Sequence, residues 1–375
     1  MAMIDKVWIR WLAAAFVLLC SIATALGFWF WHYYRTPSPL LTEVTVLIPK
    51  GAGVRQIGTL LAGKGVIVND VRYLAYLRFT GLGPKLQAGE YRFSPGMTPP
   101  EVLDKIARGD VLRHPVTIVE GLRLEQIAAV FAQSGWVDMA RFLQLSRDPA
   151  FIRTLQLEVG SLEGYLFPDT YLMVRGMREE ELIRQMVHSF HRVWASLPES
   201  KGLTLSQHEI VTLASVVEKE TGQAGERPLI ARVFLNRLKL GMPLQSDPTV
   251  IYGMGEAFKG NLRRGDLRTP TSHNTYVIPG LPPGPICSPG KAALEAVLKP
   301  DESDALYFVS RNDGSHVFSK TLAEHNRAVN TYQRQGRKTQ TETVMAVTPQ
   351  PEPAAPALEE KGKHVQKEQK EKGAD

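Results

Sequence analysis

The feature that most restricts this chain is an unbroken apolar segment near its N-terminus. The twenty-one residues from Trp11 to Trp31 carry no charge, and Arg35 and two prolines follow them. A membrane-spanning helix needs about 20 apolar residues, and Trp and Tyr are enriched at both membrane interfaces, as they are at both ends here. The sequence therefore predicts a transmembrane anchor over residues 11–34, preceded by a short N-terminus, 1–10.

A cleavable signal peptide is the alternative, because Ala23-Thr24-Ala25 fits the small-residue pattern of a cleavage site. The apolar run continues past that site, which favours retention of the segment. Lys6 and Arg10 precede the span, and basic residues favour the cytoplasmic side. We expect a single-pass protein of the cell inner membrane, with a cytoplasmic N-terminus and the bulk of the chain in the periplasm.

Composition limits the remaining classes. A chain of 375 residues, 44% of them hydrophobic, can form two globular domains. Its net charge of +6 is dispersed, so nucleic acid is not an expected partner. Only two cysteines are present, and Cys20 lies in the apolar segment, so Cys287 has no partner for a disulfide. We expect no metal and no cofactor.

An internal similarity at an offset of seventy residues suggests two βα units of one design. Residues 46–67 and 116–137 each predict a β-branched strand, a glycine turn, a short amphipathic helix and a second glycine. Strand-turn-helix sequences also produce such matches by chance. The first unit belongs to a predicted small α+β module, 40–113.

The main domain is predicted over 114–336, with helices at 123–134, 178–195 and 207–221. From 337 to 375, Pro, Glu, Lys, Gln and Ala dominate and aromatic residues are absent, which is typical of a disordered tail. The predicted fold class is thus α+β: one transmembrane helix, a small module, a larger mixed α/β domain and a disordered C-terminal tail.

One predicted helix carries the principal candidate residue. Ser206 and Glu209 form a capping box, and the following residues are apolar nearly all round, so the helix should be buried. Glu218 lies near its end, where it can reach solvent, pair with a cation or line a cleft. In a half-apolar cleft, desolvation would raise its pKa, as a general acid requires.

Several ordered motifs resemble the endolytic murein transglycosylases of the YceG-like family. They are LEGYLFPDTY at 162–171, ASVVEKET at 214–221, ARVFLNRL at 231–238, MPLQSDPTV at 242–250, GLPPGPI at 280–286, and LYFV at 306–309 with His316 and Phe318. The resemblance covers about nine tenths of the chain. It implies a LysM-like module over 40–113, a lytic transglycosylase domain over 114–336, and Glu218 as the catalytic residue. His273 and Ser288 depart from the family pattern, which expects Tyr and Asn.

Such an enzyme cleaves the β-1,4 bond between N-acetylmuramic acid and N-acetylglucosamine without water, leaving 1,6-anhydromuramic ends and ending strand elongation. Polar residues of the motif loops are candidate sugar contacts, with Tyr165 as a stacking surface, although turn or capping roles fit each one equally. These candidate substrate-binding residues are Glu163, Tyr165, Asp169, Gln245, Asp247, Asn274 and Tyr276.

Two other functions are consistent with the same residues. The chain could be a non-catalytic scaffold that binds peptidoglycan strands and positions cell-wall synthases. It could also be a hydrolase, with Asp247 or Glu163 as the second carboxylate that hydrolysis requires. The expected partners are peptidoglycan glycan strands, the inner membrane and cell-wall synthases.

Overall fold

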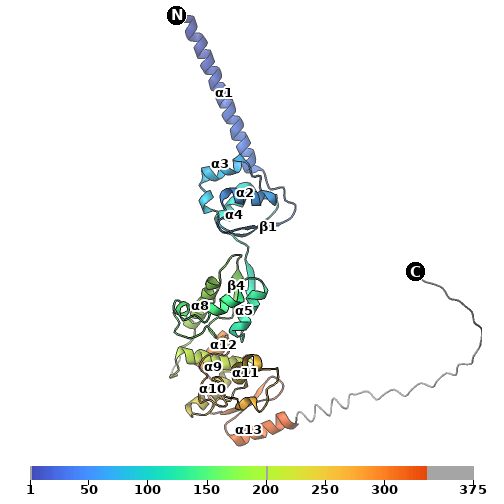
Figure 1. Ribbon diagram of the computed structural model, residues 1–375, viewed down its shortest axis with the longest axis vertical. Helices are drawn as coiled ribbons and strands as arrows, with labels where there is room; N and C mark the ends of the chain where they lie inside the picture. Colours follow the sequence, from blue (N-terminus) through green and yellow to red (C-terminus); the bar gives the residue numbers. More distant parts are fainter. Residues whose placement is uncertain (1, 200–201, 336–375) are drawn as a thin grey trace, which may run out of the picture.

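The computed structural model describes residues 2–199 and 202–335, and the predicted disordered tail lies outside this part of the chain. Helix α1, Ala2–Arg35, leads into the small module and extends away from it (Figure 1). Its apolar part, Trp8–Arg35, has a mean hydropathy of 2.1 in its most apolar stretch, of which nothing is buried against the rest of the chain. One N-terminal apolar helix is confirmed, beginning nine residues earlier than the predicted span.

The small module has the order strand, helix, helix, strand, helix. Strand β1 pairs antiparallel with β2, with Val44 opposite Phe93 and Ile48 opposite Gly89. It has its own apolar core, built around Tyr73, Tyr91 and Leu103. Its elements are β1 (Val44–Ile48), α2 (Val54–Gly63), α3 (Val71–Thr80), a 3-10 turn (Gly83–Lys85), β2 (Gly89–Phe93) and α4 (Pro99–Ala107). The α+β character is as predicted, and the LysM-like assignment stays a prediction.

The two βα units predicted from the internal similarity are present in the structure. Strand β3 (His114–Thr117) and helix α5 (Leu124–Gln133) follow β1 and α2 at the same offset of seventy residues. The glycines in the turn after each strand, Gly51 and Gly121, have φ of 79° and 77°. Glycine adopts this left-handed conformation without steric cost, so the same turn recurs for the same reason.

The main domain is helical around two small antiparallel sheets of two strands each, β3 with β4 and β5 with β6; only β5 and β6 follow each other directly as a hairpin. Its core is separate from that of the module and extends from Ile118 to Leu298. The predicted helices at 123–134, 178–195 and 207–221 correspond to α5, α8 and α9. The elements after α5 are α6 (Met139–Leu145), α7 (Pro149–Arg153), β4 (Thr170–Met173), α8 (Glu179–Ala195), α9 (Gln207–Glu220), α10 (Arg227–Lys239), α11 (Asp247–Met254), α12 (Lys291–Leu298), β5 (Tyr307–Ser310), β6 (His316–Ser319) and α13 (Leu322–Val329). Three 3-10 turns (Ala224–Glu226, Gly255–Ala257, Asp266–Arg268) and a π-helical turn (Asn330–Gln335) complete the list.

Candidate active site

Helix α9 begins and is buried as its sequence predicts. The Ser206 hydroxyl accepts the Glu209 amide, and the Glu209 carboxylate accepts the Ser206 amide in return. All eight residues from Ile210 to Val217 are buried, and α9 packs against α10, α11 and α12. Since the body of the helix is enclosed, its last turn is held firmly, and that turn carries Glu218.

The Glu218 carboxylate is nearly enclosed and accepts two hydrogen bonds. Its side chain is 5% exposed. Oε1 accepts from Arg227 Nη2 at 2.8 Å, and Oε2 accepts from the Gly290 amide at 3.0 Å. Gly290 is the N-cap of α12, and a helix N-terminus favours negative charge. Both carboxylate oxygens are therefore hydrogen-bonded, one to a guanidinium and one to the N-terminus of a helix.

A second carboxylate, that of Glu120, lies beside the same arginine. Its Oε2 is 3.9 Å from Arg227 Nη2, and its carboxyl group lies so close to Gly290 that a Cβ there would overlap it. Burial, and then the charge of Glu218, raise the pKa of Glu120, while Arg227 acts in the opposite direction. Two acidic side chains thus share one guanidinium.

Backbone hydrogen bonds explain why Glu120 comes so close to Gly290. The Gly121 amide donates to the Ser288 carbonyl at 2.9 Å, and the Ser288 amide donates to the Leu122 carbonyl at 2.8 Å. These bonds join the turn after β3 to the loop before α12. The departure from the family pattern at Ser288 therefore lies where these two segments meet.

Glu218 and Glu120 line an open hollow of about 540 Å³ beside the end of the β3–β4 sheet where Thr117 pairs with Thr170. Asp169 and Thr170 also line it, and they border a second hollow of about 520 Å³ as well. Arg113, His188 and Arg192 lie in the second hollow, where Arg192 is 3.7 Å from the Asp169 carboxylate. The two hollows share the lining residues Asp169 and Thr170, and we call the pair the groove: its Glu218 end is lined by acidic side chains, and its other end by basic ones. Of the predicted substrate contacts, only Asp169 lies in it.

The Glu163 carboxylate is buried, and its hydrogen bonds are all to groups inside the domain. Its carboxylate accepts the amide of Leu124, the first residue of α5, at 3.1 and 3.2 Å, and the Tyr252 hydroxyl at 3.2 Å. Burial raises its pKa to about 7, against the opposing effect of the Leu124 amide. Glu163 therefore caps a helix beneath the surface, and it does not line the hollow that contains Glu218.

The predicted stacking role of Tyr165 is corrected by its position. The side chain is 1% exposed. Its hydroxyl is hydrogen-bonded to His208 Nδ1 at 2.8 Å, and its ring meets Phe190 edge-on at 5.0 Å. The Tyr165 ring is thus enclosed within the domain, and no ring face is open to a sugar.

Asp247 and Tyr276 lie near Glu220, as does Ser246, the neighbour of Gln245 in the chain. Glu220 follows Glu218 by two residues and so points to another side of the helix. Ser246 donates to the Glu220 carboxylate, and burial raises the pKa of Glu220 to about 7. Tyr276 donates to Asp247 Oδ1 at 2.6 Å. The Gln245 amide donates to the Thr275 carbonyl. The structure therefore divides the predicted site residues into two groups on different sides of α9.

Asn274 has a structural role within this second group. It is fully buried, and its side-chain amide donates to the backbone carbonyls of Asp266, Leu267 and Thr269. Since its amide nitrogen is already occupied, the predicted sugar contact by Asn274 is not supported. His273, the other departure from the family pattern, lies with its ring 4.7 Å from that of Tyr252, and burial lowers its pKa.

Sequence reasoning missed Glu120 and Arg227, although one signal for Glu120 was available. In the internal similarity, Glu120-Gly121 of the second unit corresponds to Lys50-Gly51 of the first. A carboxylate thus replaces a lysine at the same place in a repeated turn. Arg227 had no such signal, because only the fold brings the start of α10 to Glu218.

Within residues 2–199 and 202–335, no group of three or more His, Cys, Asp or Glu side chains is arranged to hold a metal ion. The groups of the candidate site are two carboxylates, one arginine side chain and one backbone amide at the end of the groove.

Comparison with known proteins shows the family to which the chain is similar. A model of the YceG-like family matches residues 46–331. The chain is 35% identical over 310 residues to a Bacillus subtilis protein named endolytic murein transglycosylase, covering 78% of this chain and 85% of that one. It is 31% identical to proteins of the same name from Streptococcus pneumoniae, covering 84% of this chain and 64% of theirs.

A solved structure is also similar. The crystal structure of a YceG-like protein from Listeria monocytogenes matches with a TM-score of 0.51 and 33% identity, covering 76% of this chain and 98% of that one.

Proposed function

This chain belongs to the YceG-like family, and we propose that it is an endolytic murein transglycosylase, a lyase that cuts peptidoglycan glycan strands. The bond cleaved is the β-1,4 linkage between N-acetylmuramic acid and N-acetylglucosamine in nascent strands. The observation that carries the proposal is the Glu218 carboxylate, nearly enclosed at the end of a buried helix and open to one groove.

In the proposed reaction Glu218 transfers one proton twice. Glu218 first donates it to the glycosidic oxygen as that bond breaks. The carboxylate then accepts the proton of the 6-hydroxyl of the same muramic acid, and this oxygen bonds to C1. The product is a 1,6-anhydromuramic end, and no water enters. Tethering the nucleophile can lower a barrier by roughly 7–11 kcal/mol in ideal cases.

Glu218 must hold a proton before the first step, yet here it is paired with Arg227. The position of Glu120 offers a way to release it, because Arg227 Nη2 lies 2.8 Å from one carboxylate and 3.9 Å from the other. In our proposal, a sugar entering the groove displaces water and Arg227 moves to Glu120. Glu218 then lacks its cation in a dry site, which favours the neutral acid. Glu120 is thus a positioning residue.

The other site residues keep more limited roles. Asp169, with Thr117 and Thr170, is proposed to bind sugar hydroxyl or N-acetyl groups in the groove. Gln245, Asp247 and Tyr276 are proposed as a second contact area around Glu220. Glu163 is proposed to act indirectly, by holding the start of α5 beside the turn that carries Glu120.

We further propose that α1 anchors the protein in the inner membrane, with its N-terminus in the cytoplasm and both globular parts in the periplasm. The apolar run continues past the alternative cleavage site to Trp31, which supports retention. The small module is proposed to bind glycan as LysM-like modules do. Cutting nascent strands next to the membrane would end their elongation, with cell-wall synthases as partners.

The test uses the full-length protein in detergent micelles and uncrosslinked glycan strands, with mass spectrometry of the new ends. We expect anhydromuramic ends from the unmodified protein and from Glu158→Gln, an exposed control, and none from Glu218→Gln. A non-catalytic scaffold would leave the strands intact in every case. Equal anhydro product from Glu218→Gln would remove Glu218 from its role.

Labelled water separates lysis from hydrolysis. Glu120 brings a second carboxylate to the groove, and most glycosidases that hydrolyse their substrate use two carboxylates. If water is the nucleophile, digestion in H2¹⁸O places the heavy isotope at reducing muramic ends. We expect anhydro ends without the isotope.

A further inference from the structure

Helix α3 of the small module has two apolar faces, and only one of them is covered. Tyr73 and Leu77 face the core of the module. On the other face Val71, Ala75 and Phe79 follow one another at intervals of four residues, which places them in one line along the helix. Phe79 is 83% exposed and Val71 is 62% exposed. An exposed apolar line on an otherwise packed helix requires an explanation.

The same helix contacts the end of α1. The rings of Phe30 and Phe79 lie 6.5 Å apart, edge to face, and those of Tyr34 and Tyr76 lie 6.1 Å apart. The guanidinium of Arg72 lies over the ring of Trp29 at 4.9 Å and over that of Tyr33 at 4.8 Å. All of these contacts fall within residues 29–34 of α1.

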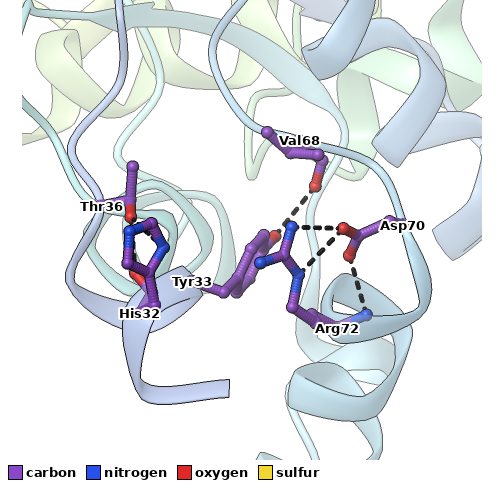
Figure 2. Close-up of polar contacts among 6 residues, drawn as sticks. All are labelled: His32, Tyr33, Thr36, Val68, Asp70 and Arg72. Atoms are coloured by element: carbon purple, nitrogen blue, oxygen red, sulfur yellow. Dashed lines mark hydrogen bonds and ion pairs between the residues drawn. The ribbon is translucent and has the colours of Figure 1, made fainter. Parts of the chain in front are cut away.

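Hydrogen bonds hold this junction in place (Figure 2). The Tyr33 hydroxyl donates to the Val68 carbonyl at 3.1 Å. Arg72 is in turn paired with Asp70, whose carboxylate accepts from Arg72 Nη2 at 2.6 Å and caps the start of α3. Since Tyr33 is buried in the core of the module, the end of α1 and the module are packed together as one unit.

The contacts show how α3 lies relative to α1. Moving along α3 through Arg72, Tyr76 and Phe79, the partners on α1 are residues 29 and 33, then 34, then 30. The partners do not advance along α1, so α3 crosses it instead of running beside it. If α1 spans the bilayer, α3 lies in the plane of the membrane surface.

The depth of α3 follows from the length of the span. At 1.5 Å per residue, about 20 residues cross the roughly 30 Å hydrocarbon core, and twenty residues counted from Trp11 end at Phe30. Phe79 packs against Phe30, so its ring lies at the boundary between acyl chains and headgroups. Aromatic side chains and helices with an apolar face are favoured there.

We infer that α3 is a membrane-surface helix whose line of Val71, Ala75 and Phe79 contacts the lipids around α1. Arg78, exposed beside Phe79, is placed to meet lipid phosphates. The partner is a phospholipid surface, and the contact would set the module at a fixed angle to the membrane. This inference rests on the proposed anchoring by α1, and the experiment below separates the two.

The test places an environment-sensitive fluorophore in full-length protein in nanodiscs of phosphatidylethanolamine and phosphatidylglycerol. One variant carries the label at Phe79→Cys and a matched control carries it at Leu240→Cys, an exposed residue after α10. Both have Cys20→Ala, and the remaining Cys287 is fully buried. A third sample carries the label on native Cys20, within the proposed span.

We expect lipids brominated near the headgroup end of the acyl chain to quench the label at 79 several-fold more than the label at 240. Equal quenching at 79 and 240, with the label at Cys20 quenched by deep bromine atoms, would overturn the inference and leave the anchor in place. An unquenched Cys20 label would overturn the anchor, and the inference with it.

Discussion

Arg227 Nη2 lies 2.8 Å from Glu218 Oε1, and the two side chains are both largely buried at the acidic end of the groove. This ion pair is the central relationship of the candidate site. In the proposed mechanism this pair holds the carboxylate in place, and it has to be broken before Glu218 can act as an acid.

Arg227→Met is expected to destabilise the protein at neutral pH. It leaves Glu218 buried without its cation, and breaking one side of a buried pair costs roughly 3–5 kcal/mol. Lowering the pH protonates the uncompensated carboxylate, so the loss should shrink between pH 7 and pH 5. Urea denaturation at both pH values measures it, with the exposed Arg153→Met as control. The same loss at both pH values would contradict the assignment.

Glu120→Gln is expected to slow strand cleavage roughly tenfold while the KM for glycan changes little. The reason is that Arg227 would have no second carboxylate to move to and would stay on Glu218. Protonating Glu218 would then need more acid, so the optimum of the pH profile should move to lower pH.

Glu120→Asp keeps the second carboxylate and should recover part of the rate and the original optimum. An unchanged pH optimum in Glu120→Gln would show that Glu120 does not compete for Arg227.

Glu163→Gln is expected to stabilise the protein at pH 8 and to change little at pH 5. Burial raises the pKa of Glu163 to about 7 in the folded state. A carboxyl group whose pKa is higher in the folded than in the unfolded protein stabilises the folded state. That stabilisation is fully present below the pKa of the unfolded state and is lost as the pH rises through about 7. The single amide oxygen of the variant, placed where Oε2 lies, can accept from both Leu124 and Tyr252, so the gain at pH 8 should be roughly 1–3 kcal/mol. Denaturant titrations at the two pH values measure it, and the exposed Glu158→Gln should show no such difference between them.

Gly164→Ala is expected to destabilise the main domain by roughly 1–3 kcal/mol. Gly164 has φ of +84°, and a Cβ there would overlap Pro285 in the GLPPGPI loop. Gly160→Ala is the matched control, because no atom lies within 4 Å of its Cβ position and its φ is not positive. Thermal unfolding of both variants would test this, and equal midpoints would contradict the proposed close contact.

Local features of the sequence were sufficient for the elements that frame the site. The capping box of Ser206 and Glu209 and the apolar surface of α9 involve neighbours within a few residues, so they are visible in the sequence. The repeated turns at Gly51 and Gly121 are visible for the same reason, because each needs glycine at one defined position. The burial of Tyr165 and Asn274 was not visible, because a polar residue in a motif can serve packing as well as binding.

The sequence by itself determined where α5, α8 and α9 begin to within one residue, that α9 is buried, that one apolar segment is long enough to span a membrane, and that Glu218 lies at the end of an enclosed helix. Only the tertiary structure decided what surrounds that carboxylate. Glu120, Arg227 and Gly290 come from three separate segments, and hydrogen bonds between the turn after β3 and the loop before α12 bring two of them together. The charge state of a buried carboxylate depends on such neighbours in space, and spacing along the chain does not encode them.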